Sequence, residues 1–153
     1  MFSRMIRRLG HRRWFAAVGS RVLPRLDRAT YRLSGRRWML ASIAFPTILL
    51  HCGGSKPVPL LHARHDGGFL VAATNWGRPQ HPAWSTRLLS GCAAAVEMHR
   101  VVTPVAARSL TGEEMSAVWP LLLEVWPAFD TYRKRARREI RVFHLTPRAP
   151  TPT

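Results

Sequence analysis

Apolar residues in the first part of the chain recur at helical spacing. The apolar positions i, i+3, i+4 and i+7 are occupied by Phe2, Met5, Ile6 and Leu9, and arginines stand between them. This spacing predicts a basic amphipathic helix, because residues three and four apart share one face. The period continues weakly to Leu26, and a further short helix is expected over 27–33. The helical segment over residues 1–40 either packs on the core or contacts an anionic membrane surface.

From Phe45 onward the pattern changes to short apolar runs that are typical of strands. Asp66-Gly67 separates two of these runs and is a strong signal for an antiparallel hairpin. Pro104 is expected to confine its strand to an edge or a bulge, because proline donates no ladder hydrogen bond. About six strands are expected, over 47–51, 58–64, 69–74, 93–98, 100–108 and 140–145.

Helices are expected between some of these strands. A short helix over 82–89 has proline at its start. Thr111-Gly-Glu-Glu114 is a capping box that begins another, which Pro120 is expected to kink or restart. Pro127 opens a last helix to about Arg135. Strands that follow one another in a run predict a barrel-like α+β domain over 41–147, with a tail over 148–153.

The charge of the chain is strongly basic, with a formal net charge of +16. Basic blocks lie in the first 40 residues and at Arg133–Arg141, and they indicate an anionic partner. Charge alone would also suit a nucleic-acid binder. No recognised nucleic-acid-binding motif accompanies it, so no nucleic-acid partner is predicted, and a basic nucleic-acid or membrane-surface binding protein stays a further alternative.

The cysteines and histidines point to no metal centre. Cys52 and Cys92 form no disulfide framework or metal motif, which favours a reducing compartment. His51, His62 and His65 lack metal-ligand spacing. The longest apolar run, Met39–Leu50, is too short to cross a bilayer. We therefore expect a cytoplasmic protein, or one peripheral at the inner face of the plasma membrane.

Several stretches together resemble a known family. Val71–Trp84 is a strand, a glycine-containing loop and a His-Pro-x-Trp helix start. It is followed in order by Trp119-Pro120, by Trp126–Tyr132, by Arg138-Glu-Ile-Arg-Val142 and by Leu145-Thr-Pro147. This order, over about residues 4–147, resembles the deazaflavin (F-420)-dependent nitroreductase and quinone reductase proteins of actinobacteria.

The resemblance implies an FMN-binding-like split β-barrel with N-terminal helices and a C-terminal helical insertion. It implies an oxidoreductase that transfers hydride from reduced coenzyme F-420 to a quinone or nitroaromatic acceptor, because the cofactor carries the reactive carbon. Alternatives are a degenerate, non-catalytic member and a split barrel that binds FMN or haem. Where the family has a longer basic loop, this chain has only Gly53-Gly-Ser-Lys56 before Pro57.

The resemblance also implies a set of site residues. The cofactor-binding residues are predicted to be Gly53, Gly54, Ser55, Lys56, Pro59, Leu60, Ala72, Ala73, Thr74, Asn75, Ala83, Trp84 and Arg87. Glycine, serine and lysine suit a phosphate, although a plain turn has the same composition. Thr74 and Asn75 would bind a ring carbonyl, or only form a turn.

The acceptor site is predicted at the C-terminal aromatic residues. Trp126, Phe129 and Tyr132 are spaced three apart, so they share one side of a helix. The resemblance makes them an acceptor pocket, whereas the spacing by itself is more typical of a core stripe. Tyr132, as a proton donor, and Thr74 are the catalytic candidates.

Overall fold

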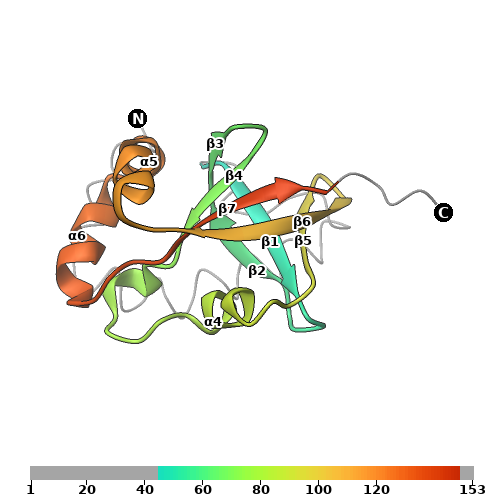
Figure 1. The fold of residues 1–153 in the computed structure, drawn as a ribbon, viewed down its shortest axis with the longest axis horizontal. Coiled ribbons are helices and arrows are strands. Elements are labelled where there is room, and N and C mark those ends of the chain that lie inside the picture. The colour runs from blue at the N-terminus through green and yellow to red at the C-terminus, as the bar shows by residue number, and fades with distance from the viewer. Residues whose placement is uncertain (1–44, 149–153) are drawn as a thin grey trace.

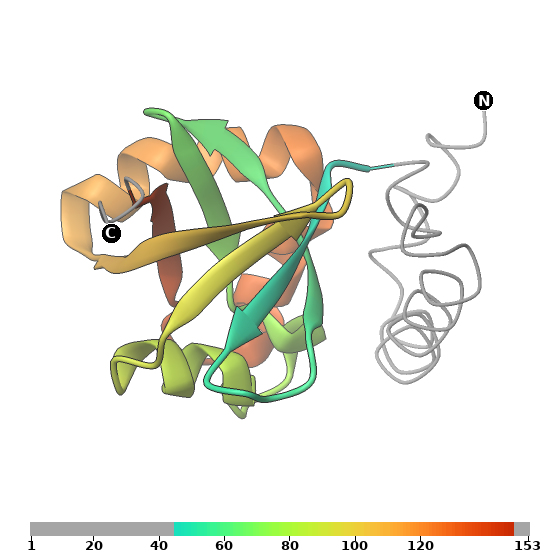
Figure 2. The same ribbon diagram turned by 90° about the vertical axis from the view of Figure 1, so that its right-hand side faces the viewer.

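The barrel is built from seven strands, all paired antiparallel, in a computed structural model that describes residues 45–148. The strands are β1 (Thr47–Cys52), β2 (Val58–Leu61), β3 (Ala63–His65), β4 (Gly68–Ala72), β5 (Ala94–Met98), β6 (Val101–Leu110) and β7 (Val142–Pro147). Their order is β2-β1-β5-β6-β7-β4-β3 (Figure 1). The sheet curls until β2 contacts β4, which nearly closes the barrel (Figure 2).

Helices cover the barrel at two places. The 3-10 turn η1 (Asn75–Gly77) and helix α4 (Ala83–Leu89) connect β4 to β5. Helices α5 (Gly112–Val125) and α6 (Ala128–Ala136) are inserted between β6 and β7. In Figure 1, α4 lies along the lower end of the barrel, and α6 lies beside η1. The expected α+β split barrel with a C-terminal helical insertion is confirmed.

Two apolar clusters hold these layers together. The first fills the barrel and contains Ile48, Leu50, Cys52, Phe69, Val71, Ala73, Trp84, Leu88, Val96, Val105, Phe143 and Leu145. The second lies between the inserted helices and the sheet, and includes Phe45, Leu70, Leu110, Met115, Trp119, Leu122, Trp126, Phe129, Tyr132, Ile140 and Val142. Alternating residues of β4 enter different clusters, because successive side chains of a strand point to opposite faces.

One strand more is present than the sequence predicts. The apolar run at 58–64 was expected as a single strand, but it forms β2 and β3 with His62 between them. The backbone N–H of His62 donates to the carbonyl of Pro46, 3.0 Å away, instead of continuing a ladder. The chain turns there, so β2 pairs with β1 while β3 pairs with β4.

The structure contradicts the expectation for Pro104, and it excludes a restart of the helix at Pro120. Pro104 lies in an interior strand, paired with β5 on one side and β7 on the other. Its carbonyl accepts from the Arg148 N–H just past the end of β7. The proline nitrogen points to the same side, where β7 has ended, so no hydrogen bond within the ladder is lost. Pro120 lies inside α5, which continues as one helix because Val118, Trp119 and Leu122 pack in a single cluster.

The expected N-terminal helices, their membrane contact and the tail beyond Arg148 lie outside the described residues. Within residues 45–148, no helix has the length and apolar character needed to cross a membrane.

Candidate functional site

The turn between β1 and β2 has a conformation that requires glycine. Gly53 and Gly54 have φ angles of 56° and 70°, which side-chain-bearing residues rarely adopt. The Gly53 N–H donates to the carbonyl of Ala93, and the Ser55 hydroxyl donates to the carbonyl of Cys52. Lys56 stands exposed at the end of the turn. The structure thus presents a cation beside a tight glycine turn.

A disulfide joins this turn to the region after α4. Cys52 and Cys92 are bonded, with their Cα atoms 5.7 Å apart. The expectation of two unpaired cysteines is therefore wrong. They are 40 residues apart in sequence and become neighbours only because β1 pairs with β5, where Cys52 lies opposite Ala94. Sequence spacing carries no signal for such a pairing.

The disulfide places Arg87 close to the glycine turn. The Cys92 N–H donates to the carbonyl of Arg87, at the end of α4. The Arg87 Nε is buried and has no hydrogen-bond partner among the described residues. A buried guanidinium donor without a partner is costly, and an anion at this site would satisfy it.

The second part of the site is the loop over residues 73–82, which follows β4. Its turn η1 has three successive positive φ angles, at Asn75, Trp76 and Gly77. Two of these are not glycine, and such backbone costs about 1 kcal/mol or more per residue. The Asn75 amide donates to the carbonyl of Gln80, 2.8 Å away, as turn chemistry predicts. Ala73 and Thr74 are buried at the end of β4.

Helix α4 connects the two parts. Ala83 is exposed at its start, Trp84 is buried against Phe143, and Arg87 lies in its last turn. A helix of 7 residues is about 10 Å long, so the 73–82 loop and the glycine turn lie at its opposite ends. The half-buried Pro59 and Leu60 lie on β2 opposite β1, and the half-buried Ala72 pairs with Val142.

The three aromatic residues predicted for the acceptor pocket lie in the helical core, and Tyr132 contacts the 73–82 loop. Trp126, Phe129 and Tyr132 are buried in the cluster between the helices and the sheet. The ring of Tyr132 packs 6.0 Å from that of Trp76, beneath η1. Burial raises the pKa of Tyr132, and contacts with Trp126 and Arg135 offset part of this rise. The structure gives these residues packing contacts, and an acceptor role stays a prediction.

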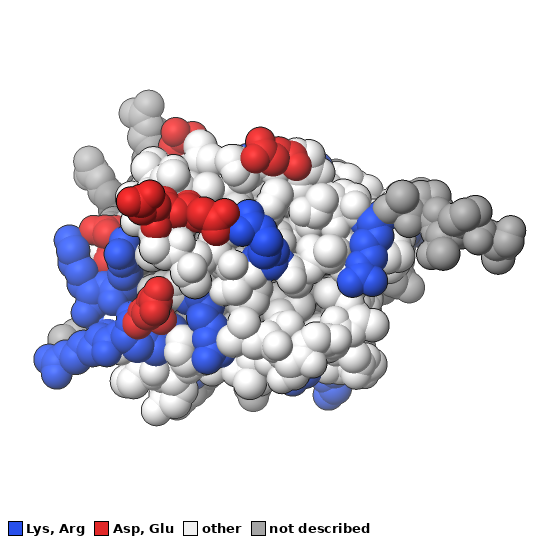
Figure 3. All heavy atoms as spheres, in the orientation of Figure 1, with Lys and Arg blue, Asp and Glu red and all other residues white. Residues whose placement is uncertain are grey.

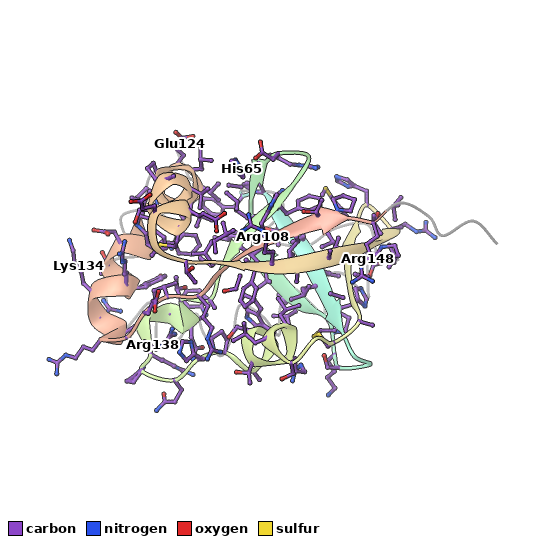
Figure 4. The ribbon with its side chains drawn as sticks, in the orientation of Figure 1. His65, Arg108, Glu124, Lys134, Arg138 and Arg148 are labelled. Carbon is purple, nitrogen blue, oxygen red and sulfur yellow. A yellow bond between two sulfur atoms is a disulfide. The ribbon has the colours of Figure 1, made fainter. Side chains whose placement is uncertain are left out.

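Two arginines that sequence reasoning did not single out hold the 73–82 loop and α4. Arg141 donates to the hydroxyls of Ser85 and Thr86 in α4. Arg138, labelled in Figure 4, donates to several carbonyls of the loop. Both belong to the basic block that the sequence analysis assigned to an anionic partner. Their position directly before the predicted last strand was the only sequence signal that could have pointed to a structural role.

The molecular surface is unevenly charged. Lysine and arginine side chains gather over α6 and its neighbourhood, while the middle of the same face, over β6 and β7, is mostly uncharged (Figure 3). Part of this positive charge is neutralised within the protein, because Lys134 pairs with Asp130 at 2.9 Å on the surface of α6. Arg133 lies over the ring of Trp119.

The three candidate histidines are separated. His51 pairs with the buried Glu97 at 2.7 Å, His65 lies near Asp66, and His62 packs edge-on against Phe69. Among residues 45–148, no three His, Cys, Asp or Glu side chains come together as metal ligands would.

The fold and the site around α4 define a split-barrel protein with a lysine beside a tight glycine turn, and comparison with known proteins gives the family. The profile of the F420H2-dependent quinone reductase family matches residues 21–147. The chain therefore belongs to the F420H2-dependent quinone reductase family, which is a family of oxidoreductases.

Individual relatives agree with this assignment. A putative F420H2-dependent quinone reductase of Mycobacterium tuberculosis, Rv3178, is 26% identical over 108 residues, which is 67% of this chain and 91% of that protein. The solved structure of an F420-H2 dependent reductase (FDR-A) has a TM-score of 0.60 and 29% identity, covering 65% of this chain and 93% of the other. A structure described as a domain-swapped dimer has a TM-score of 0.61 and 26% identity, covering 77% and 94%.

Proposed function

We propose that this protein binds reduced coenzyme F-420 and uses it to reduce a quinone. The observation that carries the proposal is the Cys52–Cys92 bond in a chain of this family. It joins the glycine turn to Cys92, whose N–H donates to the carbonyl of Arg87. The proposed cofactor position runs along α4, with the phosphate at the turn and the ring beside Thr74 and Asn75.

The residues present fit an anionic cofactor. Lys56 supplies an exposed ammonium group, and the buried Arg87 Nε is a donor that needs an acceptor. No side chain at Gly54 narrows the turn, and an added Cβ there would meet no atom within 4 Å. When bound, the deazaflavin supplies the hydride, so the protein needs to orient the ring, hold the anionic tail and exclude water.

We propose a flat, hydrophobic acceptor, with a quinone as the first choice and a nitroaromatic compound as a second. Quinone reduction is the activity for which the family is named, and the barrel end near Trp84 is largely apolar. The chain offers no carboxylate next to Thr74 among the described contacts, so an acid–base pair is not part of the proposal.

Titration of the protein with deazaflavin and with FMN tests cofactor choice. Tryptophan fluorescence provides the signal, because Trp84 is inside the barrel and Trp76 lies in the 73–82 loop. We expect tighter binding of coenzyme F-420 than of FMN or NADPH. Equal or tighter binding of FMN would assign the site to a flavin instead.

Lys56→Ala should weaken cofactor binding by about 1.5–3 kcal/mol, or roughly 10–150-fold in Kd, if its ammonium group pairs with the phosphate. The chain has one other lysine, Lys134, which is exposed and paired with Asp130 on α6. Lys134→Ala is therefore a matched control and should leave Kd unchanged. An unchanged Kd in Lys56→Ala would show that the phosphate is bound elsewhere.

Tyr132→Phe tests the proton-donor hypothesis. The hydroxyl is buried, and it makes no hydrogen bond of ordinary geometry to the described residues. We therefore expect this variant to oxidise bound reduced cofactor at nearly the wild-type single-turnover rate. A rate lower by about 10²–10⁴-fold would instead establish Tyr132 as a general acid.

A further inference from the structure

The guanidinium group of Arg138 is the centre of a hydrogen-bond network around the 73–82 loop. Arg138 follows Arg137, whose φ of 52° ends α6 and turns the chain toward β7. The Arg138 donors reach Arg78 O from Nε (3.2 Å), His81 Nδ1 (3.1 Å) and Glu139 O (3.2 Å) from Nη1, and Ala73 O (3.1 Å), Thr74 O (3.3 Å) and Gln80 O (3.2 Å) from Nη2.

Four of these acceptors are backbone carbonyls at both ends of the same loop. Ala73 and Thr74 begin it, and Arg78 and Gln80 lie on its return side. Between them lies η1, with its three successive positive φ angles. Strained backbone persists only where surrounding contacts determine it, and strain of this kind gathers at functional sites. Arg138 is the side chain that ties the two ends together.

The environment keeps this network in one protonation state. Burial and the neighbouring charges of Arg138 and Arg141 lower the pKa of His81, so the ring is neutral near pH 7. A neutral imidazole can accept a hydrogen bond at Nδ1 from the arginine. Burial also lowers the pKa of Arg138, but an arginine keeps its charge at any physiological pH.

We propose that Arg138 is a positioning residue for the reaction: it fixes the 73–82 loop in the conformation that presents Thr74 and Asn75 to the deazaflavin ring. The inference rests on the proposed function and adds a residue that touches neither cofactor nor acceptor. Five N–H donors in a planar fork are needed, because the carbonyls surround the group from several directions. The three donors of a lysine ammonium group cannot reproduce this arrangement.

Arg138→Lys tests the inference, with Arg108→Lys as control. Arg108 is exposed on β6 and pairs with Glu114 at 2.9 Å. Its replacement by lysine is the same chemical change at a position away from the 73–82 loop. In the cofactor-free protein, Arg138→Lys should speed hydrogen exchange of the Gly77 and Arg78 amides, which donate to Thr74 O and Asn75 O. Exchange in β6 and β7 should stay unchanged, as should all exchange in Arg108→Lys outside its own surroundings.

Binding of two probes then separates positioning from general stability. One probe is reduced coenzyme F-420, and the other is a deazaflavin ring without the phosphate-bearing tail. Arg138→Lys should raise Kd for both probes by about tenfold or more, since the loop that presents Thr74 and Asn75 to the ring loses its hydrogen bonds to a charged donor. Lys56→Ala should raise Kd only for the complete cofactor.

Each result decides between the claims. Faster loop exchange with unchanged Kd for both probes would overturn the positioning role, as would unchanged loop exchange. Faster exchange throughout the barrel would show that Arg138 only stabilises the fold, and would also overturn it. If the wild-type protein binds neither probe, the proposed function fails, and the positioning role fails with it even though the loop result still stands.

Discussion

Gly68→Ala should destabilise the barrel by about 3 kcal/mol or more, because the added methyl group has no space. A Cβ at Gly68 would lie 2.5 Å from the carbonyl oxygen of Leu145 and 2.7 Å from the His144 ring. The first of these atoms is backbone, so β4 and β7 would have to separate where they are paired. Thermal or urea unfolding monitored by tryptophan fluorescence measures the loss.

The neighbouring glycine supplies the control. Gly67 has a φ of 69°, but an added Cβ would meet no atom within 4 Å. Gly67→Ala should therefore cost only the conformational penalty of about 1–2 kcal/mol. Equal losses in the two variants would mean that backbone conformation, and not the contact between β4 and β7, sets the requirement at Gly68.

Stability should fall between about pH 6.5 and pH 4 because of His62. Burial and the charge of Arg64 lower the pKa of His62 from 6.5 to about 4, with a partly opposing contribution from Pro46. In this window the unfolded chain binds a proton that the folded protein excludes. Stability is therefore full above pH 6.5 and is lost as the pH falls, by on the order of 2–3 kcal/mol in all.

His62→Gln should flatten this part of the pH profile, because glutamine stays neutral and does not titrate. His99→Asn is the control, since His99 lies exposed in the β5–β6 turn and asparagine tolerates its positive φ. Urea midpoints measured from pH 7 to pH 4 give the comparison. A slope in His62→Gln as steep as in the wild-type protein would assign the acid sensitivity to other groups.

The sequence predicted the elements whose signals are local. Alternating or continuous apolar runs located β1, β4, β5, β6 and β7 to within a few residues, and the Asp66-Gly67 turn located the hairpin of β3 and β4. Thr111 is the N-cap of α5, as the capping box predicts, although its side chain makes no capping hydrogen bond.

The features that sequence reasoning missed depend on contacts between distant residues. Pairing of β1 with β5 creates the Cys52–Cys92 bond. The spacing predicted that Trp126, Phe129 and Tyr132 share one side of a helix, which is wrong for Trp126, because it is the C-cap of α5 and lies outside α6. All three lie in the helical core, which spacing alone cannot distinguish from a pocket. Arg138 looked like one of many surface cations, because its hydrogen-bond partners other than Glu139 lie 57–65 residues away in the sequence.

The candidate-site residues were chosen through family resemblance and not through residue chemistry, and they stay a prediction. Gly53–Lys56 and Asn75 have compositions that fit an ordinary turn, and their observed hydrogen bonds are also turn contacts. The arrangement of both turns at the two ends of α4 is a property of the fold. It is this arrangement, together with the family match, that supports a cofactor lying along the helix.

Oxidation of reduced coenzyme F-420 by a soluble quinone is the most direct test of the proposed activity. The purified protein is mixed with the reduced cofactor and the quinone, and the return of the oxidised deazaflavin absorbance is followed against a sample without protein. We expect catalysed oxidation that saturates in both substrates and is slowed at low cofactor concentration by Lys56→Ala, but not by Lys134→Ala. A rate equal to the uncatalysed one, with a wild-type protein shown to be folded, would contradict the proposed function.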